Sequence, residues 1–173
     1  METKDCIRTR ASVRDFRPDD IPRKDIDEIL EAATAAPCAG NVQEWRFVVV
    51  KKMETKEKLA EAAFQQTLVK KAPVVIVVCS DLREIGDAYG ERGQSLYSVQ
   101  DTANATQNMI LAAWDKGIGS CWIGSFNEKS VRDALVLPAH VRPLAILPLG
   151  YPASVPYKPG RKSLKEVVHE DFY

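Results

Sequence analysis

The sequence predicts a single α+β domain that spans residues 1–173. A chain of 173 residues suits one hydrophobic core, because a domain of this size buries about two-thirds of its unfolded surface. Segments with apolar residues at helical spacing alternate with short β-branched segments, as in folds of mixed α and β structure. We find no internal repeat and no low-complexity segment, so the pattern favours one domain.

The first half of the chain is expected to contain two helices and two strands. Apolar residues recur at helical spacing over residues 21–36, and Pro37 ends that pattern. Residues 46–51 are largely β-branched and form the first expected strand. Thr55 is expected to cap the second helix. A second strand, at residues 74–79, is apolar throughout and is therefore expected to be buried on both faces.

The middle of the chain is expected to hold a loop and a long helix. Residues 81–95 carry three glycines among charged residues, which predicts a long mobile loop. Residues 96–116 place apolar side chains on more than one side of a helix, so this helix should be central in the fold. Gly117 and Gly119 follow the apolar pattern and are expected to end the helix.

The last third is expected to contain two more strands and two short helices. The strands are expected at residues 120–123 and 144–149. Between them, Asn127 is expected to cap a helix that ends at Leu135. The remaining tail is rich in proline and basic residues, has too few apolar residues to fold alone, and offers a capping box at residues 163–166.

The charge balance excludes several classes of partner. The 24 Lys and Arg residues balance the 24 Asp and Glu residues, so neither nucleic acid nor an anionic membrane surface is expected to bind. The first twenty residues are charged throughout, which excludes a secretory signal, and no apolar run is long enough to span a bilayer. We therefore expect a soluble cytoplasmic protein.

The cysteines and glycines do not form a recognised catalytic or metal motif. Four cysteines lie far apart without a Cys-x-x-Cys pair, so we expect free thiols and neither a metal site nor a disulfide framework. Nothing in the spacing pairs Cys38 with His140 or His169 as a nucleophile and base. The run from Gly117 to Gly124 lacks the glycine spacing of a dinucleotide loop and follows a helix instead of a strand.

Two groups of polar residues are candidates for binding. Arg10, Ser12 and Arg14 place two guanidinium groups beside a hydroxyl, and the forked donors of arginine match phosphate oxygens. The alternative for this group is a solvated charged surface, because surface charges are common and contribute little. Asn41 and Gln43 place two amides at the corner before the first strand, where a simple turn would not need them. This corner is therefore a candidate binding surface.

The order and spacing of these groups resemble the flavin-dependent nitroreductase family over nearly the whole chain. The matching segments are "RASVRDF" (10–16), "AAPCAGNVQEWRF" (35–47), "QDTANATQNMILAAWDKGIGSCWIG" (100–124), "LPLGYP" (147–152) and "GRKSLKEVVH" (160–169). The resemblance implies an FMN-binding α+β homodimer with a mainly antiparallel sheet flanked by helices. It further implies that terminal segments are exchanged between subunits and that the two flavin sites lie at the subunit interface.

The resemblance also implies a set of flavin-binding residues. Positions that match contacts to the FMN phosphate and ribityl groups are Arg10, Ser12, Arg14 and Arg161, and positions that match the loop beside the flavin ring are Pro37, Cys38, Asn41 and Gln43. Ile123, Gly124 and Ser125 match the backbone segment that faces flavin N5. Three residues depart from the family pattern: Ala11 replaces an arginine, Cys38 replaces a serine and Glu44 replaces a proline.

The implied activity is electron transfer from NADH or NADPH through flavin N5 to a small acceptor, such as a nitroaromatic compound or a quinone. The two substrates would react in turn, in a ping-pong cycle. No catalytic side chain is expected, because the flavin carries the hydride chemistry. The alternatives are another reaction on the same fold, such as reductive dehalogenation or flavin fragmentation, and a flavin-binding protein without catalytic activity.

Overall fold

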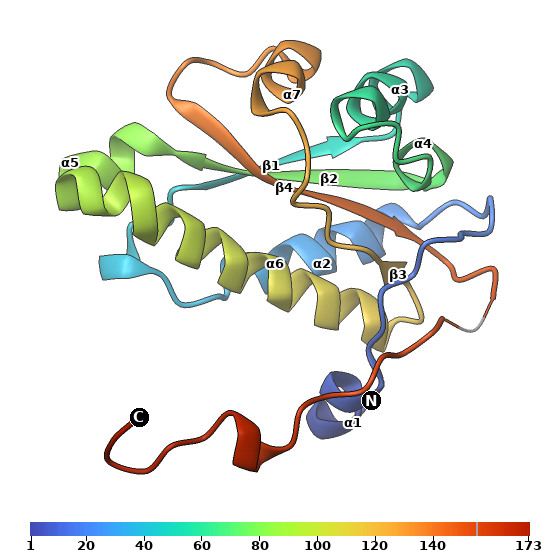
Figure 1. Cartoon of the computed structure of the whole chain (residues 1–173). Coiled ribbons are helices and arrows are strands. Elements are labelled where there is room, and N and C mark those ends of the chain that lie inside the picture. Colours follow the sequence, from blue (N-terminus) through green and yellow to red (C-terminus); the bar gives the residue numbers. More distant parts are fainter. Residues whose placement is uncertain (155) are drawn as a thin grey trace.

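The computed structural model describes residues 1–154 and 156–173. Its helices are α1 (Thr3–Thr9), α2 (Arg23–Thr34), α3 (Met53–Ala62), α4 (Leu68–Lys71), α5 (Leu82–Arg92), α6 (Ser98–Asp115) and α7 (Glu128–Leu135), with short turns η1 (Ala39–Asn41), η2 (Gly93–Tyr97) and η3 (Leu164–Glu166). Its strands are β1 (Trp45–Val50), β2 (Val74–Asp81), β3 (Gly119–Ser120) and β4 (Val141–Gly150) (Figure 1). The expected α+β fold class is confirmed.

The strands form one sheet with the order β1-β2-β4-β3 in the described part of the chain. Each neighbouring pair is antiparallel, with Trp45 opposite Ser80 in the first pair and Val74 opposite Leu149 in the second. β2 lies inside the sheet between β1 and β4, and every one of its residues is buried. The prediction of a fully buried strand at residues 74–79 is therefore confirmed.

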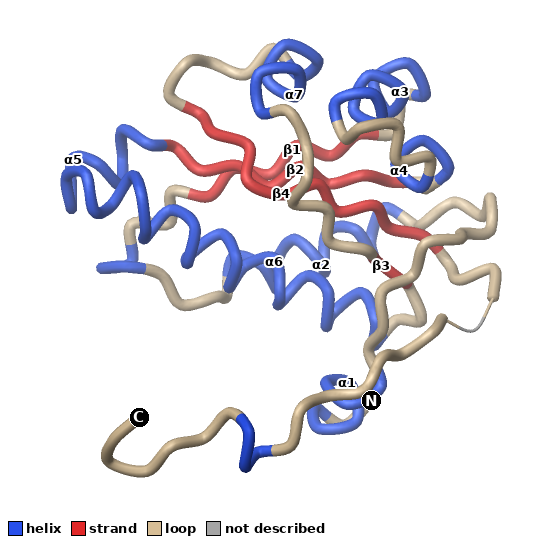
Figure 2. Tube along the Cα trace, viewed as in Figure 1, coloured by secondary structure: helices blue, strands red, loops and turns tan. Residues whose placement is uncertain are grey.

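Helices cover both faces of this sheet (Figure 2). α2 and α6 lie on one face, and α3, α4 and α7 lie on the other. The side chains of β2 alternate between two hydrophobic clusters: Ile76 and Val78 belong to the cluster with α2 and α6, whereas Val75 and Val77 belong to the other. Burial on both faces explains why the sequence of this strand is apolar without interruption.

Several local predictions agree with the structure. In α2, Ile26, Ile29 and Ala33 are fully buried, as their helical spacing indicates. The Asn127 side chain accepts a hydrogen bond from the Ser130 N–H at 2.9 Å and caps α7. A capping box joins Ser163 to Glu166 around η3.

The predicted loop at residues 81–95 is wrong, because this segment forms α5 and most of η2. The Asp81 side chain accepts hydrogen bonds from the N–H groups of Arg83 and Glu84, which caps the first turn of α5. The glycines here have different roles: a β-carbon at Gly93 would lie 2.4 Å from the Ile85 carbonyl oxygen, whereas Gly90 has open space around it and a φ angle of 56° at a kink. They therefore mark a tight contact and a kink within helical segments instead of a loop.

Other boundaries also differ from the expectation. α3 begins at Met53, so Thr55 lies in its first turn and is not the cap. The strand expected at residues 120–123 is shorter, because only Gly119 and Ser120 pair regularly with β4, although Ile123 makes a separate bridge to Ile146. The strand expected at 144–149 begins earlier, at Val141. The sequence analysis did not anticipate α1 or α4, which are short and bury few side chains.

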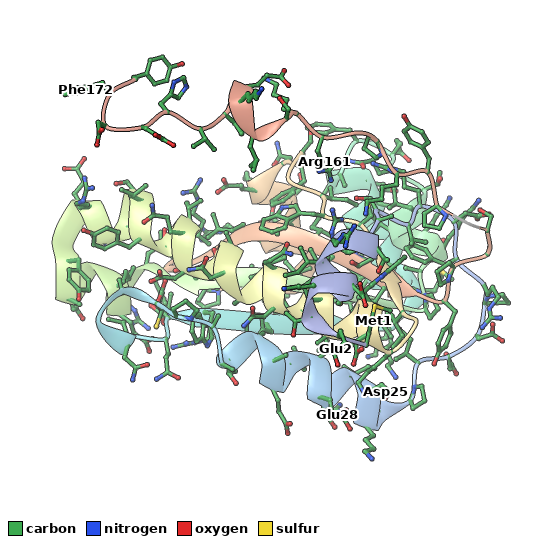
Figure 3. All side chains as sticks on the ribbon, turned by 90° about the horizontal axis from the view of Figure 1, so that it is seen from below. Met1, Glu2, Asp25, Glu28, Arg161 and Phe172 are labelled. Carbon is green, nitrogen blue, oxygen red and sulfur yellow. The ribbon has the colours of Figure 1, made fainter. Side chains whose placement is uncertain are left out.

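The C-terminal tail extends away from the sheet and the helices that cover it. It lies on the α6 side of the sheet in Figure 1, and Figure 3 shows it from below with Arg161 and Phe172 labelled. All residues from 157 to 173 are exposed. Among the described residues, the four cysteines are unpaired, and no helix has the length and apolar character needed to cross a membrane.

Candidate functional site

The N-terminal segment lies in an extended conformation beside the short strand β3. The Val13 N–H donates to the Ser120 carbonyl oxygen at 2.9 Å, and Ser12 forms a parallel bridge with Ser120. Side chains of extended backbone alternate between two sides. Ala11 and Val13 are accordingly buried, whereas Ser12 is half-buried and Arg14 is exposed. The segment therefore presents its polar side away from the core.

Two distant parts of the chain line one cavity of about 230 Å³. Its lining comes from the N-terminal segment (Arg10, Ala11, Ser12 and Arg14) and from the tail (Tyr157, Lys158, Pro159 and Arg161). Figure 3 labels Arg161 on this tail. The structure thus brings together, within one chain, the four residues that match phosphate and ribityl contacts. We call this the basic cavity.

The charges around the basic cavity are not neutralised internally. Its lining includes arginines and a lysine but no acidic side chain. Within residues 1–154 and 156–173, no carboxylate forms an ion pair with Arg10, Arg14 or Arg161. Arg161 donates only to the neutral carbonyl oxygens of Pro159 and Gly160, at 3.1 and 3.0 Å. Such a cluster favours an anion with several oxygen acceptors.

Residues 37–43, between α2 and β1, form the second candidate region, which we call the 37–43 corner. Gly40, Asn41 and Gln43 have φ angles of 53°, 57° and 57°. Left-handed backbone is uncommon for residues with a side chain and tends to occur at functional sites. Pro37, Asn41 and Gln43 are exposed, and Cys38 is half-buried. The two amide side chains are therefore available to a ligand.

Helix α6 holds the 37–43 corner through two polar side chains. The Asp101 Oδ2 atom accepts a hydrogen bond from the Ala39 N–H at 2.9 Å, and the Asn104 side-chain amide donates to the Pro37 carbonyl oxygen at 3.2 Å. Both contacts come from the N-terminal half of the helix. The corner is thus positioned by a rigid element, as a binding loop requires.

Cys38 lies within this corner, but its surroundings do not activate the thiol. Burial raises the pKa of Cys38, and the nearby carboxyls of Asp101 and Glu44 raise it further. A reactive cysteine needs the opposite shift, because the thiolate is the nucleophile. The environment therefore favours a packing role for the protonated side chain.

The segment Ile123–Ser125 follows β3 at the same edge of the sheet as the N-terminal segment. Ile123 is buried and pairs with Ile146, whereas Gly124 and Ser125 are exposed. The Ser125 carbonyl oxygen accepts a hydrogen bond from the Gln66 side chain at 3.3 Å. This segment is held in place on its outer side and leaves the backbone of Gly124 accessible.

A single chain does not bring the basic cavity and the 37–43 corner together. The corner contacts α6 at Asp101, whereas α1 contacts the other end of this helix, where Trp114 donates to the Thr9 hydroxyl at 2.9 Å. At 1.5 Å per residue, these two anchor points are about 20 Å apart along α6. The cavity is lined from the N-terminal segment and the tail, and no residue of the corner contributes to it.

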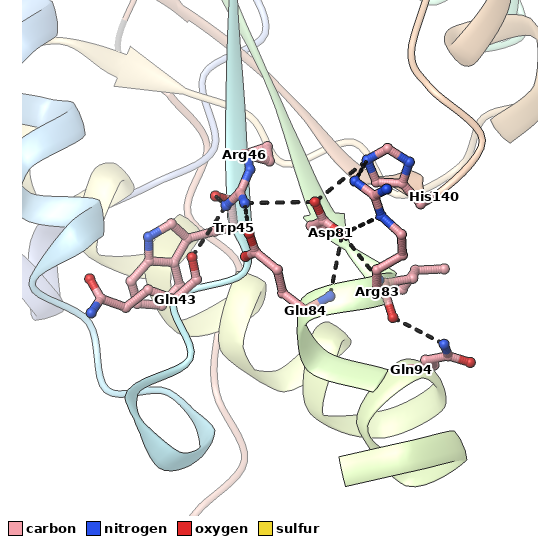
Figure 4. A network of polar contacts seen from close by, with 9 residues as sticks. Gln43, Trp45, Arg46, Asp81, Arg83, Glu84, Gln94 and His140 are labelled. Atoms are coloured by element: carbon pink, nitrogen blue, oxygen red, sulfur yellow. Dashed lines mark hydrogen bonds and ion pairs between the residues drawn. The ribbon is translucent and has the colours of Figure 1, made fainter. Parts of the chain in front are cut away.

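A polar network joins the corner to α5 (Figure 4). The Arg46 guanidinium donates to the carbonyl oxygens of Gln43 and Trp45 at 3.3 and 2.9 Å and pairs with Glu84. It also lies 3.7 Å from the buried carboxylate of Asp81, which caps α5. The network therefore ties the last residue of the corner to the start of the helix.

Sequence reasoning missed three residues that shape these regions. Lys158 lines the basic cavity and could have been selected from the basic composition of the tail. Asp101 is 5% exposed. It lies on the apolar side of α6, in helical register with Ala105 and Met109, and an acidic residue on an apolar helix face can be recognised from the sequence. Glu44 is fully buried and was noted only as a departure from the family pattern.

A metal centre has no support in the part of the chain that the structure describes. No group of three His, Cys, Asp or Glu side chains there could hold a metal ion. The two candidate regions present arginine, lysine, hydroxyl and amide groups, which can bind an anionic organic ligand.

Comparison with known proteins gives one consistent family. A model of the nitroreductase family matches residues 7–73 and 64–151. An NADH dehydrogenase of Thermus thermophilus is 34% identical over 195 residues, which cover 97% of this chain and 95% of the relative. An FMN reductase (NADPH) of Bacillus subtilis is 32% identical over 184 residues, which cover 99% of this chain and 74% of the relative.

The fold comparison agrees with the sequence comparison. The NADPH:FMN oxidoreductase of Vibrio harveyi, solved in complex with NAD+, superposes with a TM-score of 0.91 at 28% identity. The match covers 99% of this chain and 77% of that chain. The similarity thus includes the N-terminal segment, the 37–43 corner and the tail.

Proposed function

The chain belongs to the nitroreductase family, and on this premise we propose that it is an FMN-dependent oxidoreductase. It takes electrons from NADH or NADPH and passes them to a small acceptor, such as a nitroaromatic compound or a quinone, in a ping-pong cycle. Several relatives are named for flavin or nicotinamide chemistry of this kind. We propose the cytoplasm as its compartment, because its thiols are free and the reduced nicotinamide donors are cytoplasmic metabolites.

The basic cavity is the observation that carries this proposal. The FMN phosphate has about two negative charges at neutral pH and three strongly accepting oxygens. Arg10, Arg14, Arg161 and Lys158 supply cationic donors that have no acidic partner lining the cavity. Its volume of about 230 Å³ suits the phosphate end of the cofactor, since pockets for whole ligands are larger, about 300–1,000 Å³.

The other predicted site residues complete the binding of the ring. Asn41 and Gln43 offer amide donors and acceptors to its polar edge, and the accessible backbone of Gly124 and Ser125 is assigned to the N5 side. Bound FMN would supply the hydride chemistry. The chain's own contribution is to orient the cofactor, limit access to it and set its electrostatic surroundings.

The separation of the two regions supports a homodimer. About 20 Å of α6 lies between their anchor points, and a second copy that supplied one region would bring both regions to one cofactor. The tail exposes apolar side chains that a second copy could cover: Leu164, Val168 and Phe172 are 76%, 53% and 87% exposed. We propose that each flavin site is completed across the dimer interface and that the tails are exchanged.

Spectroscopy of the purified protein tests the proposal. We expect a bound flavin spectrum that is bleached by anaerobic addition of NADH or NADPH and restored by a quinone or a nitroaromatic compound. Flavin that stays oxidised with both donors would instead indicate a binding protein without this activity. Failure to bind FMN on reconstitution would overturn the proposal. Light scattering provides the second test, since a monomer with full FMN occupancy would contradict the shared site.

A further inference from the structure

A buried carboxylic acid lies directly beside the exposed amides of the 37–43 corner. Glu44 is 0% exposed, although Gln43 before it is exposed. Its backbone is fixed, because its carbonyl oxygen accepts the Asp81 N–H at 2.7 Å. In the described part of the chain, neither oxygen of its carboxyl group accepts a hydrogen bond from a donor. A buried carboxyl group without donors is unfavourable as an anion and favourable as a neutral acid, which can itself donate to a neighbouring acceptor.

The charges that face Glu44 reinforce this preference. Asp101 on α6 and Glu84 on α5 oppose its ionisation, and Arg46 on β1 favours it. The Cys38 thiol is a further titratable neighbour. Burial is the main cause of the shift, and it raises the pKa of Glu44 to about 7. Arg46 compensates little, because its guanidinium is already engaged by Glu84 and lies near Asp81.

Asp101 connects this acid to the backbone of the corner. Burial also raises the pKa of Asp101, while the hydrogen bond from the Ala39 N–H and one with Glu44 lower it. Its carboxylate must stay an acceptor to hold Ala39. Of the two carboxyls, Glu44 is therefore the better position for a proton, from which it can donate to Asp101.

We propose that Glu44 and Asp101 share one proton beneath the 37–43 corner, and that this proton positions the corner for the flavin. With the proton present, Asp101 holds the Ala39 N–H, and Asn104 holds the Pro37 carbonyl. When the proton leaves to solvent, two like charges face each other in a buried site, and the corner moves away from α6. Both residues are positioning residues, and the inference rests on the proposed flavin function.

The direction of the pH dependence follows from linkage. The pKa of Glu44 is higher in the folded chain than the ordinary value of 4.5, so the folded state holds the proton more tightly than the unfolded state. Stability from this group is complete below pH 4.5, falls as the pH rises to about 7, and then levels off. Flavin affinity should fall above pH 7, because loss of the proton loosens the corner.

The first measurement needs no cofactor. Urea unfolding of the flavin-free protein is followed from pH 5 to pH 8.5 for the wild type, for Glu44→Gln and for Glu57→Gln, an exposed control on α3. We expect the wild type and Glu57→Gln to lose stability between pH 5 and pH 7, and Glu44→Gln to show no such loss. Curves with the same slope in all three proteins would overturn the shared proton.

The second measurement links the proton to the flavin. From pH 6.5 to pH 8.5, the FMN dissociation constant of the wild type should rise by up to about 25-fold, the limit for one required proton with a pKa of about 7. Glu44→Gln should change by less than about twofold. Because the FMN phosphate titrates equally in both experiments, the difference between the proteins isolates Glu44. Equal changes in both would overturn the positioning role.

The two proposals fail in distinguishable ways. If no variant binds FMN at any pH, the proposed function is wrong, while the stability curves still decide the shared proton. If Glu44→Gln does not fold, infrared titration of the carboxyl groups in the wild type and in Asp101→Asn tests the shared proton instead. We expect the band of a protonated carboxyl to disappear near pH 7 in the wild type. Its absence at pH 6 would overturn the inference.

Discussion

Replacement of Gly119 by alanine should disturb both the fold and the basic cavity. A β-carbon at this position would lie 2.4 Å from Val13 Cγ2 and 2.7 Å from Val13 Cβ. Carbon atoms in good contact are about 3.5–4.0 Å apart, so β3 and the N-terminal segment must separate by roughly 1 Å. Val13 lies between Ser12 and Arg14, and its displacement therefore carries both cavity residues with it.

The expected magnitudes favour a net loss. Forcing an extra carbon into a packed contact costs about 1–3 kcal/mol, whereas the reduced freedom of the unfolded chain returns only about 0.4–1 kcal/mol. We therefore expect Gly119→Ala to lower the free energy of unfolding by about 1–2 kcal/mol. Loss of one hydrogen bond to a charged phosphate, about 1.5–3 kcal/mol, would weaken FMN binding by at least about tenfold.

Urea unfolding and FMN fluorescence titration check these values. Gly124→Ala is the matched control for stability, because its β-carbon would lie 3.7 Å from the Trp122 side chain, an ordinary contact. Adding Val13→Ala to Gly119→Ala removes the crowded methyl groups but keeps the β-carbon that lies 2.7 Å away, so it should restore only part of the flavin affinity. If Gly119→Ala unfolds and binds FMN like the wild type, the close approach has no energetic role and the reasoning is refuted.

Four other substitutions test the assigned contacts. Arg10→Ala and Arg14→Ala should each weaken FMN binding by about 1.5–3 kcal/mol, measured by fluorescence, whereas the tail variant Lys162→Ala should not; unchanged affinity in both arginine variants would remove the phosphate assignment. Asn41→Ala should weaken FMN binding by about 1–3 kcal/mol, and a loss of thermal stability with unchanged affinity would show that this amide only supports the turn. Cys38→Ser should retain FMN and NADH oxidation, and loss of turnover with FMN still bound would reveal chemistry at the thiol.

Regular periodicity made much of the fold predictable. The stripe Ile26, Ile29 and Ala33 in α2 and the unbroken apolar run of β2 each have one physical explanation, and both are buried as expected. α5 was not predictable in this way. The glycines of residues 81–95 resemble loop residues, and only the structure shows that Gly93 packs against Ile85 and that Gly90 forms a kink within the helical segment.

The candidate site was predictable only as a set of residue types in order along the chain. The meeting of Arg10 and Arg161 in one cavity depends on the path of the tail, which has no apolar period to reveal it. The pairing of Glu44 with Asp101 depends on how the 37–43 corner lies on α6. Contacts between residues so far apart in sequence are set by the tertiary fold, and one sequence without relatives does not encode them in any local pattern.

The two edges of the sheet have different consequences for solubility. β3 is covered along its outer side by Ser12 and Val13, whereas β1 pairs with β2 alone in the described residues. An open edge can recruit a strand from another molecule and begin aggregation. Lys51 and Lys52 follow β1 directly and are exposed, so their charges repel a second copy that would align there. We expect these two lysines to act as gatekeepers that keep the open edge of β1 from pairing with another chain.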